Sequence, residues 1–467
     1  MLALAVGAVV LASPAAMAGG TLTVVRARFP AYFEVPAGPA FAGSAIAWAT
    51  PRLDRGFDVT IDRAGSLTSH YVATKLGDVV DTDFAASSTH TALAVDVESC
   101  DGGCKYMLYR SIESDVFAAA LGQSFVSVGC AGGSLSGAES VDLSGSVVGF
   151  FDRCAGGVVV RDLAAPGTPS RMFPGVDLVR LAGPYLAVDS VVPYKGSDFQ
   201  PPPRVTVYDL RTGQVVFSVS GRPPFDIQAD GKLVFQTAGA NPRFAWASPA
   251  DPLPHPLAPG PTSRYADLPC CSEVRIADDR IAVRTGTYDA PNPSFTVYDL
   301  HGNELATAQA SNRVASFDFD GNQLVYASQP CEVMGIVTWD LHGPPPTLAR
   351  GRCPAPRASR AVVDFRHRVL RIPVHCPRAP ALGCSGIWDT VLYRPHFDSL
   401  AGHVDAIGPG STTTFREALS RSQACAFARH RVRRVTIQLS PSGSRPHAPD
   451  PPRRLRVTTI GRAHSCR

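Results

Sequence analysis

The sequence predicts an all-β chain, and three observations lead to this prediction. Gly and Pro number 41 each, which suits many short strands joined by turns. Short apolar runs rich in β-branched residues recur along the chain, and turn residues such as Asp-Gly or His-Gly bound them. A β-rich segment that ends in Asp-Leu returns at nearly regular intervals. The first two observations predict the fold class, and the third predicts the architecture.

The repeated segment is six residues long and occurs at 158–163, 205–210, 295–300 and 336–341. The intervals between its aspartates are 47, 90 and 41 residues, for Asp162, Asp209, Asp299 and Asp340. The middle interval is two periods of about 45 residues, so one more copy is expected inside it. A period of about 40–45 residues with several strands per unit is typical of β-propeller blades. We therefore expect a β-propeller.

The clearest unit, 314–350, sets the template for the blades. It contains a first strand at 314–319, a tight Asp-Gly-Asn turn, a second strand at 324–328 and a third at 336–341. The same template predicts seven blades between about residues 35 and 352, with six or eight as alternatives because terminal repeats are the least regular. Residues 21–28 are a candidate strand to close the ring.

The last hundred residues break this repeat and form a second predicted module. Strands are expected at 368–374, 387–393, 432–439 and 455–460, where apolar and Arg positions alternate and imply one wet face. From Arg360 onward there are 18 Arg and 6 acidic residues, whereas the rest of the chain is net acidic. A basic module can bind an anionic polymer or a membrane surface. Only four of the 44 basic residues are Lys, so a GC-rich genome is the alternative explanation.

The N-terminus predicts export. Residues 2–11 are apolar, and Pro14 and the small-residue site Ala16-Met17-Ala18 follow, although no basic leader precedes them. We expect a signal peptide at 1–18, a propeller at 19–355 and the basic module at 360–467. The protein is then secreted or associated with the cell envelope.

Twelve cysteines agree with an oxidising compartment, where an even number indicates a disulfide framework. No Cys-x-x-Cys occurs and no His lies at zinc-finger spacing, which argues against a zinc site. Near neighbours suggest five pairs and leave one adjacent pair, which is either a vicinal bridge or unpaired. The expected disulfide cysteines are Cys100 with Cys104, Cys130 with Cys154, Cys331 with Cys353, Cys376 with Cys384, Cys425 with Cys466, and the adjacent Cys270 and Cys271.

Motifs for catalysis are missing from the sequence. It holds no Gly-x-Ser-x-Gly, no His-Glu-x-x-His and no phosphate loop. Asp318, Asp320 and Asn322 are spaced like the start of a calcium loop, but no acid closes that loop, so a hairpin turn is favoured. The aspartate of each Asp-Leu is expected to cap the following turn. We predict no catalytic residue, no metal and no cofactor.

Loop length favours one rim of the propeller as the functional face. Connections after the first and third strands are tight, whereas those at 99–105, 192–203, 286–294 and 328–335 are long and varied. Their aromatic and charged residues suit recognition of a sugar or a protein. The alternative is that these loops are ordinary surface with no binding role. The candidate ligand-binding residues are Tyr194, Lys195, Asp198, Phe199, Tyr288 and Asp289.

Two resemblances add to this picture. The body resembles secreted bacterial propellers with WD40-like and TolB-like repeats; Trp339-Asp340 is similar to their Trp-Asp pair, although the preceding Gly-His is absent. The last 105 or so residues resemble an immunoglobulin-like β-sandwich of secreted actinobacterial proteins, in which Val-x-Cys-Pro and Gly-Cys-x-Gly frame the first hairpin. Here these are 374–377 and 383–386, whereas 408–424 departs from the pattern. The resemblance implies an immunoglobulin-like module; an eighth blade is the alternative.

These features favour an exported, non-enzymatic binding or scaffold protein. Its propeller would present a loop-rich rim to a protein or carbohydrate, and its basic module would contact an anionic envelope polymer; no nucleic-acid partner is expected. The alternative is a polysaccharide hydrolase or lyase with acids at the propeller channel. A quinone-dependent propeller is disfavoured because the chain has only four Trp.

Overall fold

The structure is a computed structural model of the whole chain. It describes 15–17, 20–25, 37–52, 56–73, 78–99, 111–128, 141–152, 155–175, 178–190, 203–238, 243–257, 273–285, 294–309, 317–328, 334–346, 357–358, 360–378, 384–391, 399–407, 410–429, 434–441 and 453–461. Within these residues the chain is almost entirely β-structure, as the sequence predicts.

Four-stranded antiparallel sheets make up the body, and their strands follow one another in chain order. Each of these sheets begins with a hairpin whose first strand lies innermost. Four sheets consist of consecutive strands alone: β3 (Ala37–Ala42), β4 (Ala45–Arg52), β5 (Gly56–Arg63) and β6 (Ser66–Ala73); β7 (Asp78–Ala86), β8 (His90–Ser99), β9 (Ser111–Ala120) and β10 (Val126–Ser127); β11 (Val141–Ser144), β12 (Val147–Asp152), β13 (Gly157–Asp162) and β14 (Arg171–Phe173); β22 (Glu273–Ala277), β23 (Arg280–Thr285), β24 (Ser294–Asp299) and β25 (Glu304–Gln309).

One long strand serves two units. The first half of β18 (Gln214–Ile227) pairs with β17 up to Ser220, and its second half pairs with β19 from Gly221. The seven-stranded sheet therefore divides into two units of four strands that share β18. Its strands are β15 (Val179–Ala182), β16 (Tyr185–Ser190), β17 (Arg204–Asp209), β18, β19 (Leu233–Thr237), β20 (Phe244–Ala247) and β21 (His255–Pro256).

The last unit of the body takes its outer strand from the N-terminus. All six residues of β2 (Gly20–Val25) pair with β28 (Met334–Asp340), and β1 (Ala15–Met17) extends this edge. The inner members are β26 (Phe317–Phe319) and β27 (Gln323–Ser328). Of the candidate closing strand at 21–28, residues 21–25 thus lie where closure needs them, next to the end of the repeat, and 26–28 lie outside the described residues.

The inner strands of neighbouring units contact one another around the body, and β26 contacts β3. The described residues hold seven such units, and their inner strands form a closed cycle. Apolar side chains fill the spaces between units. Trp48 of the first unit, for example, packs with Val325 and Ile336 of the last one. This packing joins the two ends of the repeat.

The four Asp-Leu aspartates cap turns, which confirms their predicted role. Asp209 Oδ1 accepts the Arg211 amide at 2.8 Å, and Asp340 Oδ1 accepts the His342 amide at 2.9 Å. Asp162 and Asp299 each accept the amide two residues further on in the same way. Such Asx turns explain why one residue type ends each third strand.

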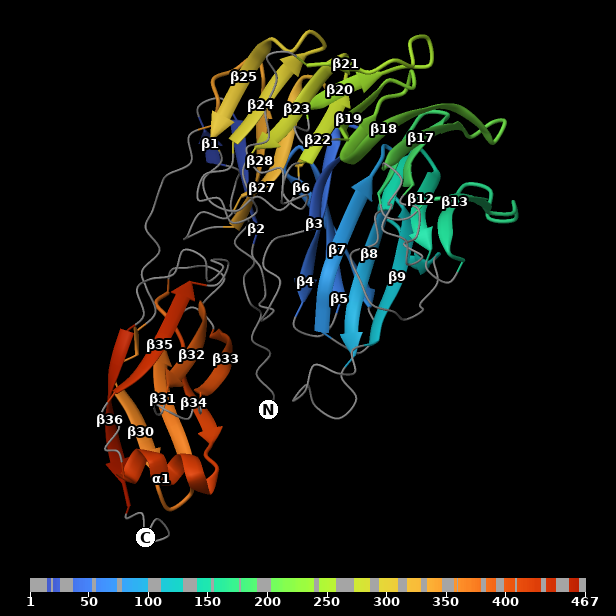
Figure 1. Cartoon of the computed structure of the whole chain (residues 1–467). Helices are drawn as coiled ribbons and strands as arrows, with labels where there is room; N and C mark the ends of the chain where they lie inside the picture. The colour runs from blue at the N-terminus through green and yellow to red at the C-terminus, as the bar shows by residue number, and fades with distance from the viewer. Residues whose placement is uncertain are drawn as a thin grey trace, which may run out of the picture.

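The C-terminal residues form a separate lobe (Figure 1). One path of paired strands runs in the order β29, β31, β30, β36, β35, β32, β33, and β34 pairs with β31. The strands are β29 (Arg357–Ala358), β30 (Arg360–Asp364), β31 (Val369–His375), β32 (Cys384–Val391), β33 (Ser399–Ile407), β34 (Thr412–Ala418), β35 (Arg434–Pro441) and β36 (Arg453–Ile460). The four predicted strands correspond to β31, β32, β35 and β36, whereas β29, β30, β33 and β34 were not predicted.

The departing segment 408–424 contains β34 and the start of helix α1 (Arg421–Arg429). Ser420 Oγ accepts the Gln423 amide at 3.1 Å, and Gln423 Oε1 accepts the Ser420 amide at 2.8 Å, which forms a capping box. Ala424 and Phe427 bury one face of the helix against Leu370 and Ile372 of the sheet. Among the described residues, no helix has the length and apolar character to cross a membrane.

Candidate functional site

Each unit of the body contributes one residue near the turn end of its inner strand. The position is the second, third or fourth paired residue back from the first hairpin turn; Asp142 opposite Gly149 and Arg180 opposite Ala187 are the third. These side chains converge on one cavity on the axis of the ring. The residues are Ala40, Asp83, Asp142, Arg180, Asp226, Arg275 and Asp318.

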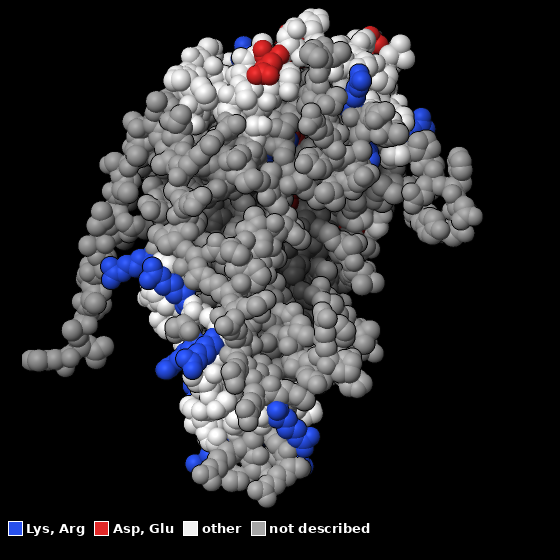
Figure 2. All heavy atoms as spheres, turned by 60° about the vertical axis from the view of Figure 1, so that its left-hand side comes forward, with Lys and Arg blue, Asp and Glu red and all other residues white. Residues whose placement is uncertain are grey.

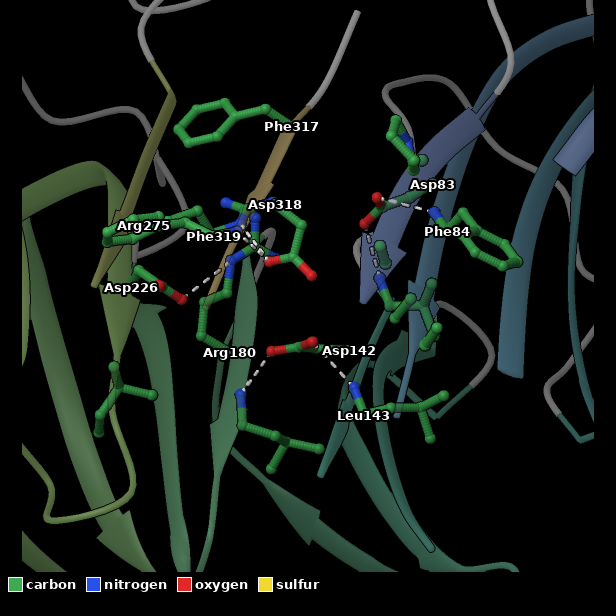
Figure 3. Close-up of a pocket in the computed structure, with 18 of the residues that line it drawn as sticks. Asp83, Phe84, Asp142, Leu143, Arg180, Asp226, Arg275, Phe317, Asp318 and Phe319 are labelled. Carbon is green, nitrogen blue, oxygen red and sulfur yellow. Dashed lines mark hydrogen bonds and ion pairs between the residues drawn. The ribbon is translucent and has the colours of Figure 1, made fainter. Parts of the chain in front are cut away.

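Together they line a cavity of about 200 Å³ to which all seven inner strands contribute. Figure 3 shows the carboxylates and guanidinium groups directed toward one another across this space. Five lining residues of the first unit and the last, Gly38, Pro39, Ala40, Phe317 and Phe319, supply an apolar part of the wall. The cavity is therefore the central channel of the body, and charged side chains dominate it.

Four aspartates use their carboxylates to tie adjacent units together. Asp142 Oδ2 accepts the Leu181 amide of the next unit at 2.7 Å, and Asp226 Oδ2 accepts the Ile276 amide at 2.8 Å. Asp318 closes the ring, because its Oδ2 accepts the Phe41 amide of the first unit at 2.8 Å. Asp83 reaches Val141 in the same way at 2.9 Å.

Three of these aspartates also accept their own following amide with the other oxygen. Asp83, Asp142 and Asp318 accept the amides of Phe84, Leu143 and Phe319 at 2.8–2.9 Å. Each of these carboxylates thus satisfies two backbone donors at the wall of the channel. Buried amides that lose such acceptors destabilise a fold, so these contacts stabilise the ring.

The two arginines point from one unit to the carboxylate of the next. Arg180 Nε lies 3.7 Å from Asp226 Oδ1, and Arg275 Nε lies 3.8 Å from Asp318 Oδ1. Arg275 also contacts Glu273 of its own strand, at 2.6 Å. Every charged channel residue therefore makes a contact with the following unit, through a backbone amide or through a carboxylate.

Burial controls the electrostatics of the channel. It raises the pKa of Asp83 and Asp142, against the lowering effect of Arg180 and Arg275, and raises the pKa of Asp318, against that of Arg275. Burial raises the pKa of Asp226 to about 7, although Arg275 and Arg180 oppose the rise. Burial also disfavours the charge of Arg275, but nearby Glu273 and Asp226 outweigh it and raise the pKa of the guanidinium.

The channel carboxylates are placed to bridge neighbouring units. No group of three or more His, Cys, Asp or Glu side chains in the described part of the chain is placed to hold a metal ion. The carboxylates are spread around the ring and directed at separate backbone donors (Figure 3). Asp226 lines the cavity and combines a pKa of about 7 with a side chain that is 11% exposed.

The predicted ligand-binding residues Tyr194, Lys195, Asp198, Phe199, Tyr288 and Asp289 lie outside the described residues. Among the cysteines, Cys376 and Cys425 are disulfide-bonded. The remaining ten cysteines lie in segments or side chains outside the description, so the pairing scheme stays a prediction.

Sequence reasoning missed the channel. Its signal is a recurring Asp or Arg, then an apolar residue, then the turn of the first hairpin, as in Asp142-Leu, Arg180-Leu, Arg275-Ile and Asp318-Phe. Asp318 was assigned to a hairpin turn with Asp320. Asp320 does form that turn, accepting the Asn322 amide at 2.9 Å, but Asp318 lies on the channel wall.

Comparison with solved structures gives distant similarities. BamB from Moraxella catarrhalis aligns over 70% of this chain and 95% of its own, with 14% identity and a TM-score of 0.36. The β-propeller domain of the Trilobed protease from Pyrococcus furiosus aligns over 66% and 96%, with 10% identity and a TM-score of 0.44. An acylaminoacyl peptidase from Pyrococcus horikoshii aligns over 74% and 58%, with 10% identity and a TM-score of 0.42. No protein-family model and no curated protein matches the chain.

Proposed function

We propose that this chain is an exported, non-enzymatic binding or scaffold protein. In this proposal the propeller presents its long-loop rim to a protein or carbohydrate, and the basic C-terminal module contacts an anionic envelope polymer. The proposal depends on one observation, which is that the channel carboxylates hydrogen-bond to the neighbouring unit. All four channel aspartates accept an amide from the next unit, so their first role is to hold the ring together.

A rigid ring of this kind supports a recognition role. Acids that are committed to backbone donors are poor candidates for general acid and base catalysis, which needs carboxylates directed at a substrate. Loops on a rigid scaffold vary without disturbing the fold, and such loops commonly carry binding residues. Tyr194 and Tyr288, in two of these loops, are the aromatic residues we expect to contact the ligand.

The finer architecture belongs to the same proposal. We assign the body as a seven-bladed propeller whose last blade is completed by β2, and the C-terminal lobe as an immunoglobulin-like module. The order β36, β35, β32, β33 in one part of the lobe and the pairing of β31 with β29 and β34 in another support two facing sheets. Ala361, Val363 and Leu455 pack with Ile372 and Val374, as expected of a core between such sheets.

One observation favours the alternative, a hydrolase or lyase that acts on polysaccharide. Asp226 has a pKa of about 7 and borders a cavity of about 200 Å³, a combination also found in catalytic acids. On this alternative Asp226 would donate a proton to the glycosidic oxygen, with a second channel aspartate as its partner.

Glycan and protein arrays probed with the secreted full-length protein test the two functions together. We expect binding of a glycan or protein that Tyr194→Ala and Tyr288→Ala weaken by about tenfold or more, because aromatic contacts dominate such interfaces. Arg211→Ala, in an exposed turn of the opposite rim, is the matched control and should bind normally.

The same preparations are assayed for release of reducing ends from array-positive polysaccharides. Depolymerisation that is lost in Asp226→Asn while the fold is retained would establish the enzyme and end the binding proposal. Binding that responds equally to the variants on both rims would show that the long rim is not the recognition face.

A further inference from the structure

The C-terminal lobe carries a row of arginines across three adjacent strands. Arg360 of β30 is the register partner of Arg456 of β36, and Arg456 is the register partner of Arg434 of β35. We call these three residues the arginine row. Neighbouring strands lie about 4.8 Å apart, so the row extends about 10 Å across the sheet.

The two described side chains of the row lie on the solvent side of the sheet. Arg360 and Arg456 are exposed, whereas the adjacent Ala361 and Leu455 point into the core. In the view of Figure 2, the coloured side chains on this lobe are basic, and the red acidic side chains on the outer surface lie on the body. Within the described residues neither Arg360 nor Arg456 forms an ion pair, in contrast to Arg371, which contacts Asp364 at 3.2 Å.

Like charges at paired positions of a sheet repel one another and destabilise it. Arg360 and Arg456 are paired in register, so a source of compensating negative charge would favour their pairing, and none of the described acids of the lobe supplies it to either residue. A linear anion laid across the strands would supply it. Guanidinium groups bind phosphate through paired hydrogen bonds, so phosphate is a suitable repeating group for such an anion.

The other positions on this face lack a feature typical of nucleic-acid sites. Proteins that bind single-stranded nucleic acid combine basic residues with aromatic side chains on which bases stack. The same-face positions on these strands are Val362 and Asp364 of β30, Arg454, Thr458 and Ile460 of β36, and Thr436 and Gln438 of β35, and none is aromatic. The one acid among them, Asp364, contacts His367 and Arg371. A polymer of phosphates without bases fits this surface.

We infer that the arginine row is a docking site for a linear phosphate-bearing polymer without bases. This inference deepens the anionic-polymer part of the proposed function and is independent of the ligand at the propeller rim. The polymer would lie across the strands along the row, and each phosphate would bind between guanidinium groups of neighbouring strands.

Binding of the full-length protein to inorganic polyphosphate tests the inference. The row variant combines Arg360→Gln, Arg434→Gln and Arg456→Gln. The control variant combines Arg366→Gln, Arg378→Gln and Arg416→Gln, which removes the same charge from exposed positions of the same lobe. We expect the row variant to bind at least about tenfold more weakly, and its log-log salt slope to be less steep by about 2, because three phosphate contacts are lost. The control should stay within about twofold of the natural chain.

A stability readout accompanies the affinities. Polyphosphate should raise the melting temperature of the natural chain and of the control but not of the row variant, because ligands stabilise the folded state that binds them. If the row variant does not fold, the single variants Arg360→Gln and Arg456→Gln replace it, each with a smaller expected loss.

Three outcomes would overturn the inference: no binding to polyphosphate, an equal loss in the row and control variants, or single-stranded DNA bound as tightly as polyphosphate. None of them bears on the rim, whose ligand is tested with variants of Tyr194 and Tyr288. If the rim does not bind its predicted ligand, the polyphosphate experiment can still be interpreted. If the arginine row does not bind polyphosphate, the rim experiment can still be interpreted.

Discussion

At the scale of single residues, the aspartates of this chain divide into two structural kinds. Those that end third strands cap exposed turns; Asp209, for example, accepts the Arg211 amide. Those on inner strands lie in the channel and accept amides of the next unit, as Asp226 does from Ile276. An aspartate at an exposed turn therefore keeps its charge in solvent, whereas an aspartate in the channel has its carboxylate buried. Burial makes the difference, because it penalises the charged form.

Asp226→Asn is expected to change how stability depends on pH. Burial raises the pKa of Asp226 in the folded protein to about 7, above its value of 3.8 in the unfolded chain. The folded state then binds the proton of Asp226 more tightly than the unfolded chain does. The stabilisation from this proton is complete below pH 3.8 and is lost as the pH rises through about 7. Asn does not titrate and keeps an oxygen that can accept the Ile276 amide.

Urea unfolding at pH 4 to 8 measures this effect. Between these limits the stability of the variant relative to the natural chain should rise by on the order of 2–4 kcal/mol, following about 1.4 kcal/mol per shifted pKa unit. Asp209→Asn, at an exposed turn, serves as the control. A stability difference that does not change with pH would contradict the assignment.

At the scale of elements, the channel aspartates act as links between sheets that share no backbone pairing. Asp142 leaves β11 and accepts the Leu181 amide of β15, and Asp318 leaves β26 and accepts the Phe41 amide of β3. Apolar packing alone holds neighbouring sheets without fixing their register. Hydrogen bonds are directional, so these links set how far one inner strand slides along the next.

Asp142→Ala is expected to destabilise the body by about 1–3 kcal/mol, because the amides of Leu143 and Leu181 lose their acceptor in a buried setting. Relief of the buried charge offsets part of the loss. Asp142→Asn keeps one acceptor oxygen, so its stability should lie between that of Asp142→Ala and that of the natural chain. Urea unfolding measures the three proteins at one pH.

Hydrogen exchange at Leu181 supplies a local readout. The alanine variant should exchange this amide faster, whereas amides of β23 in another unit should keep their protection. Equal stability of Asp142→Ala and the natural chain would show that the link does not stabilise the ring.

At the scale of the whole molecule, closure depends on residues far apart in the chain. β2 supplies the outer strand of a unit whose other strands begin at Phe317, and β26 contacts β3 at the start of the ring. A closed ring leaves no inner strand without a neighbour on either side. The N-terminal strand therefore stabilises both ends of the repeat, although it is only six residues long.

Removal of residues 1–26 should open the last unit. The edge of β28 would lose its six register partners, and buried Trp339 would lie beside an exposed edge. We expect the melting temperature to fall by on the order of 5 °C or more, since several backbone hydrogen bonds are lost at once.

A chain that begins at residue 19 keeps β2 and is the control; it should melt close to the full chain. Limited proteolysis within the strands of the last unit, β26 to β28, should become faster in the shorter protein alone. Identical melting of the two truncated proteins would show that β2 does not contribute to closure.

The sequence by itself determined the fold class, the repeat and the turn-capping role of the Asp-Leu aspartates. All three follow from local chemistry, because strand alternation and Asx turns depend on residues close together in the chain. It also marked 21–28 as a candidate closing strand.

Only the tertiary structure decided which residues meet in the channel. Asp83 and Asp318 lie 235 positions apart in the chain, yet both border one cavity. Each occupies an ordinary strand position in its own repeat, so a single repeat does not distinguish it from a solvent-facing acid; only the recurrence of Asp or Arg at this position across repeats does. Ring closure brings seven equivalent positions to one axis, and desolvation there gives them an environment that no single repeat contains.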